Sequence, residues 1–341
     1  MAYSINAKDY FNTKLWTGNS TNSTAITGVG FQPDMTWIKN RNQTDNHAIF
    51  DAIRGATYRI YPNASDAQIQ ATNSLASFDS DGFTLNDGGD ANGNGENIVG
   101  WNWKANGQGS SNTDGSINTT YTSVNTTAGF SISKWTGNST AGATIGHGLG
   151  VKPSLIIIKN LGASSQWLTW FDSFANTEMI YLNLTNAKGT GQTYFNSTTP
   201  TSSLITLGGG VDENRNTMVA YCFAEKTGFS KFGSYTGNGN ADGPMIYTGF
   251  KPAFYLWKPY NATDSWNLVD SKREGYNPDN NRLFPNSNTS EDTQDRVDLV
   301  SNGIKIKTSD GGTNSSSRSY IYMAFAEAPL VGSNNVPCTA R

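Results

Sequence analysis

The sequence is poor in the residues that most often carry chemistry. Only two of its 341 residues are histidine and two are cysteine, which is too few for a credible zinc site or a disulfide framework. Cys222 lies in an apolar, strand-like run, and Cys338 lies close to the C-terminus. A buried lone cysteine usually behaves as a small hydrophobe, so a Cys222–Cys338 bridge is the less favoured alternative. No nucleophile-elbow pattern accompanies His47 or His147, and catalytic histidine chemistry is disfavoured.

Charge is also scarce. Charged residues make up 15% of the chain, and 24 basic against 27 acidic residues give a net charge of −3. This balance predicts no electrostatic binding to nucleic acid or to an anionic membrane. No window approaches the roughly 20 apolar residues that span a bilayer, and the N-terminus lacks a basic stretch followed by an apolar run. We therefore predict a protein made in a cytoplasm, with no nucleic-acid partner and no membrane insertion.

Turn-forming and aromatic residues are abundant instead. The chain holds 36 glycines and is 12% aromatic, and short apolar stretches alternate with clusters of Gly, Asn, Asp and Pro. Aromatic and β-branched residues favour pleated, half-buried strands, and the clusters mark turns between them. The pattern is typical of sandwiches of short antiparallel strands.

One phrase occurs three times: "LWTGNST" at 15–21, "KWTGNST" at 134–140 and "SYTGNGN" at 234–240. After it come "GFQPDMTWIKN", "GVKPSLIIIKN" and "GFKPAFYLWKP", and each unit ends in a strand-like run, "IVGWNWKA", "MVAYCFAE" or "YIYMAFAE". Between these landmarks the alignment brings together Asp51, Asp172 and Asp270, and then Asn63, Asn186 and Asn286. Landmarks that keep their order three times indicate an internal repeat.

The sequence therefore predicts an all-β chain of three tandem β-sandwich repeats. The repeats are expected at 1–105, 129–226 and 227–330, with a Gly/Ser/Asn/Thr-rich linker or surface strand at 106–128 and a polar tail at 331–341. "SLIIIKN" is apolar without alternation, which predicts a central strand covered on both faces, with Ile157 buried. "SFDSDGFTL" and "LVSNGIKI" predict tight hairpins. Short helices are expected at 65–72 and 289–297.

Three groups of residues are candidates for chemistry. The aligned Asp51, Asp172 and Asp270 could serve as acid or base, but a glycosidase needs two carboxylates in one cleft, so turn capping is favoured. "DSDGFTLNDGGDANGNGE" at 79–96 has the oxygen-rich character of a calcium loop, but Phe83 occupies a ligand position and two successive turns are favoured. Trp167, Trp170 and Trp266 are candidate glycan contacts because indole faces pair with sugar rings, although core packing is favoured for them too.

The repeated phrases, with "SFDSDGFTL", "WNWKANGQGSSNTDGSINTT" and "YCFAEKTGFSKFGSYTGNGNADG", resemble a family of virion proteins from tailed bacteriophages of marine bacteria. These cyanophage and pelagiphage proteins are described as structural or tail-fibre-like, with concanavalin-like or jelly-roll units. The resemblance covers nearly the whole chain and carries no catalytic motif.

The resemblance implies a non-enzymatic virion structural protein, assembled in the host bacterial cytoplasm and exposed on the particle as a tail-fibre or appendage component that binds host surface glycans. Capsid decoration, or another docked capsid or tail role, is the alternative, and a polysaccharide-degrading enzyme is less favoured. Expected partners are other virion proteins and further copies of the chain, with a trimer as one option. No catalytic, cofactor-binding or metal-binding residue is assigned, and no cofactor is expected.

Overall fold

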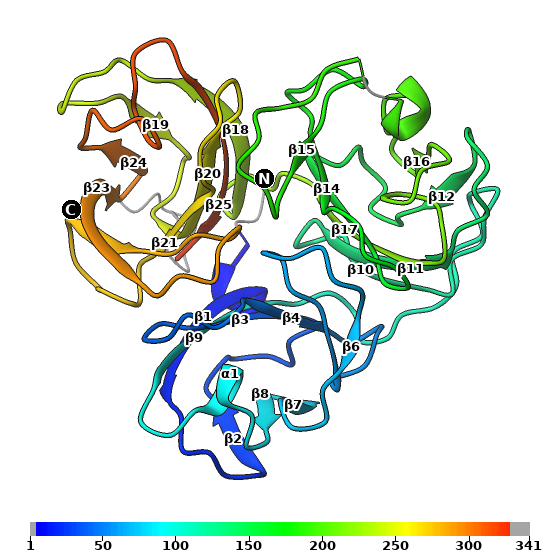
Figure 1. Ribbon diagram of the computed structural model, residues 1–341, viewed down its shortest axis with the longest axis horizontal. Helices are drawn as coiled ribbons and strands as arrows, with labels where there is room; N and C mark the ends of the chain where they lie inside the picture. Colours follow the sequence, from blue (N-terminus) through cyan, green and yellow to red (C-terminus); the bar gives the residue numbers. More distant parts are fainter. Residues whose placement is uncertain (1–4, 192, 328–341) are drawn as a thin grey trace.

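The computed structural model describes residues 5–191 and 193–327. Figure 1 shows three lobes arranged around a common centre. Lobe 1 contains strands β1 to β9, lobe 2 contains β10 to β17 and lobe 3 contains β18 to β25, and each sheet is built from strands of one lobe. All the paired strands within these sheets run antiparallel, so the predicted all-β fold is confirmed.

Each lobe turns one sheet toward the centre (Figure 1). In lobe 1 its order is β1-β9-β3-β4, in lobe 2 β10-β11-β17-β13-β14-β15 and in lobe 3 β18-β25-β20-β21. The bounds of these strands are β1 Phe11–Thr17, β3 Met35–Asn40, β4 Ala48–Asp51, β9 Asn97–Trp103, β10 Tyr121–Asn125, β11 Phe130–Thr136, β13 Leu155–Asn160, β14 Leu168–Phe171, β15 Ile180–Tyr181, β17 Thr217–Phe223, β18 Ser230–Thr236, β20 Pro252–Pro259, β21 Asn267–Asp270 and β25 Ser319–Ala326.

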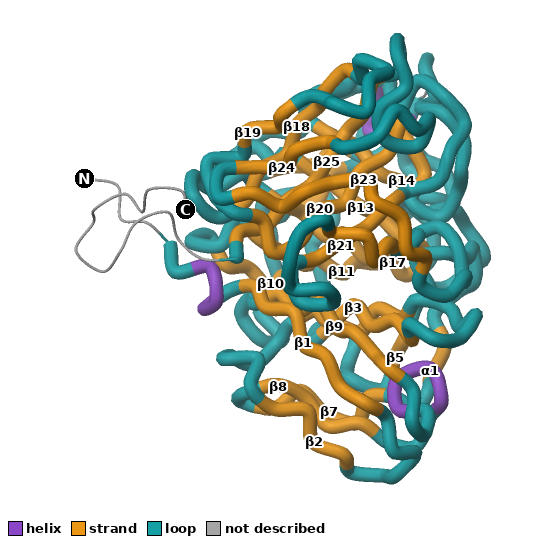
Figure 2. Tube along the Cα trace, turned by 90° about the vertical axis from the view of Figure 1, so that its left-hand side faces the viewer, coloured by secondary structure: helices purple, strands orange, loops and turns teal. Residues whose placement is uncertain are grey.

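A second, outer layer completes each sandwich. Its sheets are β2-β8-β7 in lobe 1, β12-β16 in lobe 2 and β19-β24-β23-β22 in lobe 3, and β5 and β6 form a small ribbon in lobe 1. The bounds are β2 Thr24–Thr27, β5 Tyr58–Arg59, β6 Ile69–Gln70, β7 Leu75–Asp79, β8 Gly82–Leu85, β12 Thr144–Gly146, β16 Leu204–Thr206, β19 Met245–Tyr247, β22 Asp279–Arg282, β23 Asp292–Val300 and β24 Gly303–Ile306. The short helical segments are η1 Ala7–Asp9, α1 Gly89–Asn92 and η2 Tyr194–Ser197. In the side view of Figure 2, loops cover much of the outer surface.

The central strands are buried on both faces because each face has its own cover. Alternate side chains of a strand point to opposite faces, and in β3 Ile38 joins the core of lobe 1 whereas Trp37 joins the core shared by the three lobes. Strand β13 lies between β17 and β14, as β3 lies between β9 and β4. Ile157 of β13 is 8% exposed. The predictions of a central strand and a buried Ile157 are confirmed.

Aromatic residues at the ends of the last strands meet at the centre. Trp103 and Phe223 are the last residues of β9 and β17 and Phe325 is the last but one of β25, and their ring centroids lie 5.6 to 6.4 Å apart. Next to them a small apolar cavity of about 20 Å³ is lined by residues of all three lobes. A void this small and apolar is expected to be dry.

The asparagine of the repeated Thr-Gly-Asn phrase makes two reciprocal hydrogen bonds with an asparagine in the turn before the last strand of its lobe. In lobe 2 the backbone N–H of Asn138 donates to Asn214 Oδ1, 3.3 Å away, and Asn214 Nδ2 donates to Asn138 Oδ1 at 3.0 Å. A Cβ on Gly137 would lie 2.3 Å from the backbone of Asn214, so glycine is needed for this approach. Asn19 with Asn92, and Asn238 with Asn314, make the same pair of bonds.

The structure confirms the predicted hairpins but not the predicted helices. The two hairpins form, as β7–β8 and β23–β24. The two expected helices are wrong: Ile69–Gln70 is strand β6, and most of 289–297 belongs to β23, because pairing in a sheet overrides a weak local helix preference. In the segment 106–128, β10 pairs with β11, so part of this segment is an edge strand of lobe 2. The tail 331–341 and Cys338 lie outside the described residues.

Candidate functional site

One loop of each lobe makes hydrogen bonds to a neighbouring lobe. We call these three loops the clasp loops, and they comprise residues 61–68, 181–188 and 284–291. A lysine from each central strand reaches the clasp loop of a neighbouring lobe. Lys159 of lobe 2 donates to Ser65 O at 3.0 Å, Lys258 of lobe 3 to Thr185 O at 2.9 Å, and Lys39 of lobe 1 to Asn288 O at 3.3 Å. All three lysines have no exposed surface. Burial lowers the pKa of each to about 8.

Backbone bonds repeat at the same boundaries. Gln68 donates to Leu161 O at 3.0 Å, Lys188 to Tyr260 O at 2.7 Å and Glu291 to Arg41 O at 2.9 Å. In each case the donor ends a clasp loop and the acceptor follows the central strand of the neighbouring lobe. The same backbone hydrogen bond and the same lysine contact therefore recur at all three boundaries.

A side-chain amide fixes the start of each clasp loop. The Oδ1 atoms of Asn63, Asn183 and Asn286 accept from the backbone N–H of His47, Trp167 and Trp266, over 2.7 to 3.0 Å. The sequence alignment placed Asn186 in this set, and the structure corrects it to Asn183. Asn183 lies 12 residues after Phe171, as Asn63 lies 12 residues after Asp51, so the corrected alignment needs no insertion between lobes 1 and 2.

Two boundaries also contain a buried ion pair. Asp51 bonds Arg54 at 2.5 Å, and Asp270 bonds Arg273 at 2.7 Å, with no side-chain exposure in either pair. Each carboxylate also accepts from a neighbouring lobe: the Tyr221 hydroxyl lies 2.6 Å from Asp51 Oδ2.

The equivalent donor at Asp270 is Trp101, whose Nε1 lies 2.9 Å from Asp270 Oδ2. Burial alone would lower the pKa of Arg54, but the charges and hydrogen bonds of Asp51 and Tyr221 together outweigh burial, and the pKa is raised. These carboxylates hold the lobes together, in a role larger than the turn capping that the sequence favoured.

Asp172 is not the third member of that set. Strand pairing places Phe171 opposite Leu155, as it places Asp51 opposite Met35 and Asp270 opposite Phe254. The sequence alignment was therefore one residue out. Asp172 instead bonds Lys152 at 2.5 Å and is 41% exposed.

The two histidines take part in internal hydrogen bonds. His47 Nδ1 accepts from Trp37 Nε1 at 3.0 Å, and full burial lowers the pKa of His47 well below its ordinary value. His147 Nδ1 accepts from the N–H of Leu149 at 3.2 Å, and burial lowers its pKa as well. Both contacts fit structural roles.

The three tryptophans considered as glycan contacts are buried. Trp167 and Trp266 have no exposed surface and Trp170 is 1% exposed. Trp167 Nε1 donates to Tyr61 O and Trp266 Nε1 donates to Tyr181 O, each at 2.9 Å. Both indoles therefore bind the backbone of a clasp loop. None offers a face to a sugar. Their interpretation as glycan contacts is thus corrected to core packing and lobe joining.

Lobe 1 has an open polar pocket beside its clasp loop. It has a volume of about 300 Å³ and is lined by Asp45, Asn46, Arg59, Tyr61, Asn73, Gly89 and Asp90. The Arg59 guanidinium lies 5.1 Å from the centroid of the Tyr61 ring and is paired with Asp90. Burial is the main cause that raises the pKa of Tyr61, so its hydroxyl is protonated at neutral pH.

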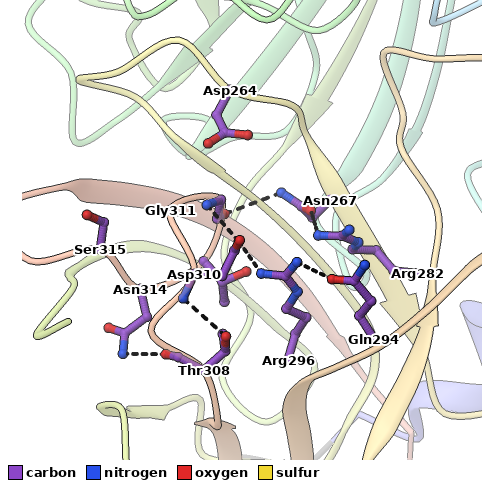
Figure 3. Close-up of polar contacts among 12 residues, drawn as sticks. Asp264, Asn267, Arg282, Gln294, Arg296, Thr308, Asp310, Gly311, Asn314 and Ser315 are labelled. Atoms are coloured by element: carbon purple, nitrogen blue, oxygen red, sulfur yellow. Dashed lines mark hydrogen bonds and ion pairs between the residues drawn. The ribbon is translucent and has the colours of Figure 1, made fainter. Parts of the chain in front are cut away.

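In lobe 3 the corresponding region is filled by its own side chains. Arg282 lies over Phe284 as Arg59 lies over Tyr61, at 4.5 Å, and donates to Asn267 Oδ1 at 3.0 Å. Figure 3 shows Arg296 between Gln294 and Asp310, bonded to both. Burial, followed by the charge of Arg282, lowers the pKa of Arg296 to about 10.

In lobe 2 two tyrosines occupy this place. The Tyr194 and Tyr181 hydroxyls lie 2.9 Å apart, and the Tyr194 hydroxyl donates to Asp212 Oδ2 at 3.2 Å. The three lobes thus share their strand arrangement but differ in the side chains that occupy the region of the lobe 1 pocket.

A second surface cleft lies between lobes 2 and 3. It has a volume of about 260 Å³, and its lining includes Asp172 and Glu225. Both carboxylates are paired with lysines, Asp172 with Lys152 and Glu225 with Lys231. Two carboxylates in one cleft are the minimum for glycoside hydrolysis, so this cleft is where the enzymatic alternative can be tested.

The segment 79–96 is the candidate calcium loop, for which the sequence favours two successive turns. In the structure this segment contains the end of the β7–β8 hairpin and helix α1. Within residues 5–191 and 193–327, no group of three or more His, Cys, Asp or Glu residues has the geometry to hold a metal ion. None of the helices there has the length and apolar character to cross a membrane.

Comparison with known families gives one match. Residues 6–329 match the model of a family described as a domain of unknown function, DUF7483. The chain belongs to this family. No curated protein and no solved structure matches the chain.

The lobe-joining lysines and the lobe 1 pocket were not predicted from the sequence. A signal for the lysines was present, because Lys39, Lys159 and Lys258 occupy the same place in three otherwise apolar strands. A lysine there needs a buried acceptor. The pocket had no comparable signal, since its residues come from four separate segments of lobe 1.

Proposed function

We propose that the chain is a non-enzymatic structural protein of a bacteriophage particle, exposed on it as a tail-fibre or appendage component that binds host surface glycans. The sequence resemblance to marine phage virion proteins supports the particle assignment. The structural observation that supports it best is the set of clasp loops. They join three small sandwiches at boundaries of one plan, which suits a rigid body that presents its outer loops.

The polar chemistry of the chain supports a binding role over catalysis. Asp51, Asp270 and the three buried lysines are engaged in joining lobes. Presenting a weak site on several copies of one rigid body raises avidity through effective concentration.

Capsid decoration is the second candidate, and one observation favours it. The three lobes surround a common centre (Figure 1), and such a body matches the local threefold positions of a particle shell. A polysaccharide-degrading enzyme has less support, because the carboxylates of the cleft between lobes 2 and 3 already pair with lysines.

The test uses the purified, fluorescently labelled chain and cells of the host of the encoding phage. We expect the chain to bind these cells and to slow infection when added before the phage. Binding without effect on host polysaccharide supports the appendage role. Release of reducing sugar ends that is lost in Asp172→Asn, with the fold intact, overturns the non-enzymatic proposal. If the chain neither binds the cells nor slows infection, but is present in purified particles, capsid decoration becomes the favoured role.

A further inference from the structure

The pocket of lobe 1 has groups that are free to bind a ligand. In the part of the chain that the structure describes, the Tyr61 hydroxyl, the side-chain nitrogen of Asn46 and the side-chain amide of Asn73 have no hydrogen-bond partner. Asn46 uses only its Oδ1 atom, which accepts from Asn63 at 2.7 Å. Asp45 uses only Oδ2, which accepts from Asn40 at 2.8 Å. The pocket therefore offers both donors and acceptors, and among them Asp45 and Asn46 are each held in place by one hydrogen bond.

An aromatic ring forms one part of the same pocket. Tyr61 is partly buried and carries Arg59 over its ring at 5.1 Å, and Arg59 is itself fixed by Ser74 at 3.0 Å and by Asp90. The ring is thus preorganised, which lowers the entropic cost of binding. An aromatic surface beside amides and carboxylates suits a sugar, which has apolar C–H faces and hydroxyl edges that donate and accept.

Charge selects among sugars. The two carboxylates of Asp45 and Asp90 and the single guanidinium of Arg59 leave a net charge of −1 in the pocket. Like charges brought together are costly, so uronic acids, sialic acids and sulfated sugars are disfavoured. A volume of about 300 Å³ is at the small end of ligand pockets, which suits one or two sugar rings.

From this geometry we propose that the lobe 1 pocket binds a neutral pyranose, with C–H groups against the part of the Tyr61 ring that Arg59 leaves uncovered and hydroxyls on Asp45, Asn46 and Asn73. The proposal deepens the glycan-binding part of the proposed function and rests on it for the source of the sugar, the host surface. It does not depend on where in the particle the protein sits.

Gly89 provides a way to close the pocket without disturbing the core. A Cβ on Gly89 would meet no atom within 4 Å, and the residue lines the pocket. Gly89→Trp should fill the space. Val211, three residues before Asn214 as Gly89 is before Asn92, is 38% exposed, so Val211→Trp is the matched control.

The ring contact has its own pair of variants. Tyr61→Ala removes the ring, and Tyr61→Phe keeps it without the hydroxyl. Tyr276, which is 69% exposed and lies on lobe 3, supplies the control Tyr276→Ala.

The experiment titrates the full chain by calorimetry with gluco-, galacto- and manno-oligosaccharides and with oligosaccharides of uronic acids. We expect at least one neutral series to bind with a Kd in the millimolar range or below, and the uronic acid series to bind at least tenfold more weakly. Gly89→Trp and Tyr61→Ala should each weaken neutral binding at least tenfold, Tyr61→Phe less, and both controls should leave it unchanged.

Three outcomes overturn the proposal: no neutral series binds, the uronic acid series binds as tightly, or binding survives Gly89→Trp. These outcomes are separate from failure of the proposed function. A chain that is found in purified particles but binds no neutral sugar keeps its structural role and loses this site. A chain that binds neutral sugar through this pocket but is absent from particles keeps the site and loses the particle role.

Discussion

The Tyr221 hydroxyl of lobe 2 donates a hydrogen bond of 2.6 Å to Asp51 of lobe 1, whose other partner is Arg54. Lobe 3 presents the same arrangement to lobe 1, with Asp270 accepting from Trp101. At the third boundary, Phe171 and Phe174 replace the ion pair, with ring centroids 5.8 Å apart. Met323, which stands where Tyr221 and Trp101 do, cannot donate and lines the central cavity together with Phe171. The three residues that decide whether a boundary is polar or apolar thus change together.

The first prediction concerns one member of this set. Asp51→Ala should lower the free energy of unfolding by about 3–5 kcal/mol, because it leaves Arg54 as an unpaired buried charge. Denaturant unfolding measures this loss. Asp172→Ala is the control, since Asp172 is exposed and its pairing with Lys152 should contribute at most about 1 kcal/mol.

The second prediction exchanges the whole set. The triple variant Asp51→Phe, Arg54→Phe and Tyr221→Met copies the boundary between lobes 2 and 3 into the boundary between lobes 1 and 2. Because no charge is left unpaired, it should recover most of the stability that Asp51→Ala loses. A triple variant as unstable as Asp51→Ala would show that the three positions do not act as a set.

The third prediction uses the buried lysines. Their pKa is about 8 in the folded chain because of burial, against about 10.4 when unfolded. Between these values the unfolded chain binds more protons, so stability should rise with pH from 8 to about 10. Each lysine should contribute about 2 kcal/mol to this rise.

Above pH 10 the sign reverses. Burial raises the pKa of Tyr221 and Tyr255 well above 10, so the unfolded chain loses protons that the folded chain keeps, and stability falls. Melting temperatures across pH 7 to 11 measure both limbs. Lys159→Met should remove part of the rise between pH 8 and 10, whereas Lys231→Met, at a surface ion pair, should not. An unchanged slope in Lys159→Met would contradict the account.

The fourth prediction concerns the repeated Thr-Gly-Asn phrase. Gly137→Ala places a Cβ 2.3 Å from the backbone of Asn214 and should cost about 2–3 kcal/mol of stability, because the loop must move away. Gly89→Ala meets open space and should change stability by at most about 0.5 kcal/mol. Equal effects of the two substitutions would refute the close approach as the reason for the glycine.

The fifth prediction concerns the shared core. Ile157 lines the central cavity, and Ile157→Asp would put an unpaired carboxylate there, which should abolish soluble expression. Ile157→Val removes one methyl group and should cost about 1 kcal/mol. Normal yield and an unchanged melting point for Ile157→Asp would contradict the burial argument.

The sequence predicted the strands well because their signals are local. An apolar run such as 155–158 needs cover on both faces, and Asp81-Gly82 and Asn302-Gly303 mark hairpins by their own backbone preferences. The recurrence of Thr-Gly-Asn indicated a repeated unit, and the hydrogen bonds between Asn138 and Asn214 show what its asparagine does.

Register and partnership were harder to predict. Asp172 and Asn186 look equivalent to their counterparts in sequence, but strand pairing selects Phe171 and side-chain bonding selects Asn183. A shift of one or three residues leaves the sequence pattern intact and changes which side chain faces a neighbour. Partnership also decides the place of Trp167 and Trp266, because each donates its indole N–H to a backbone carbonyl of another lobe.

The central claim, that this chain is a structural component of a phage particle, is tested most directly by cryo-electron microscopy of purified particles of the encoding phage. The account predicts three-lobed density at repeated positions on the tail or capsid, into which residues 5–191 and 193–327 fit as one body, with the lobe 1 pocket facing outward. Particles that lack such density, and in which mass spectrometry finds none of the chain, would contradict it.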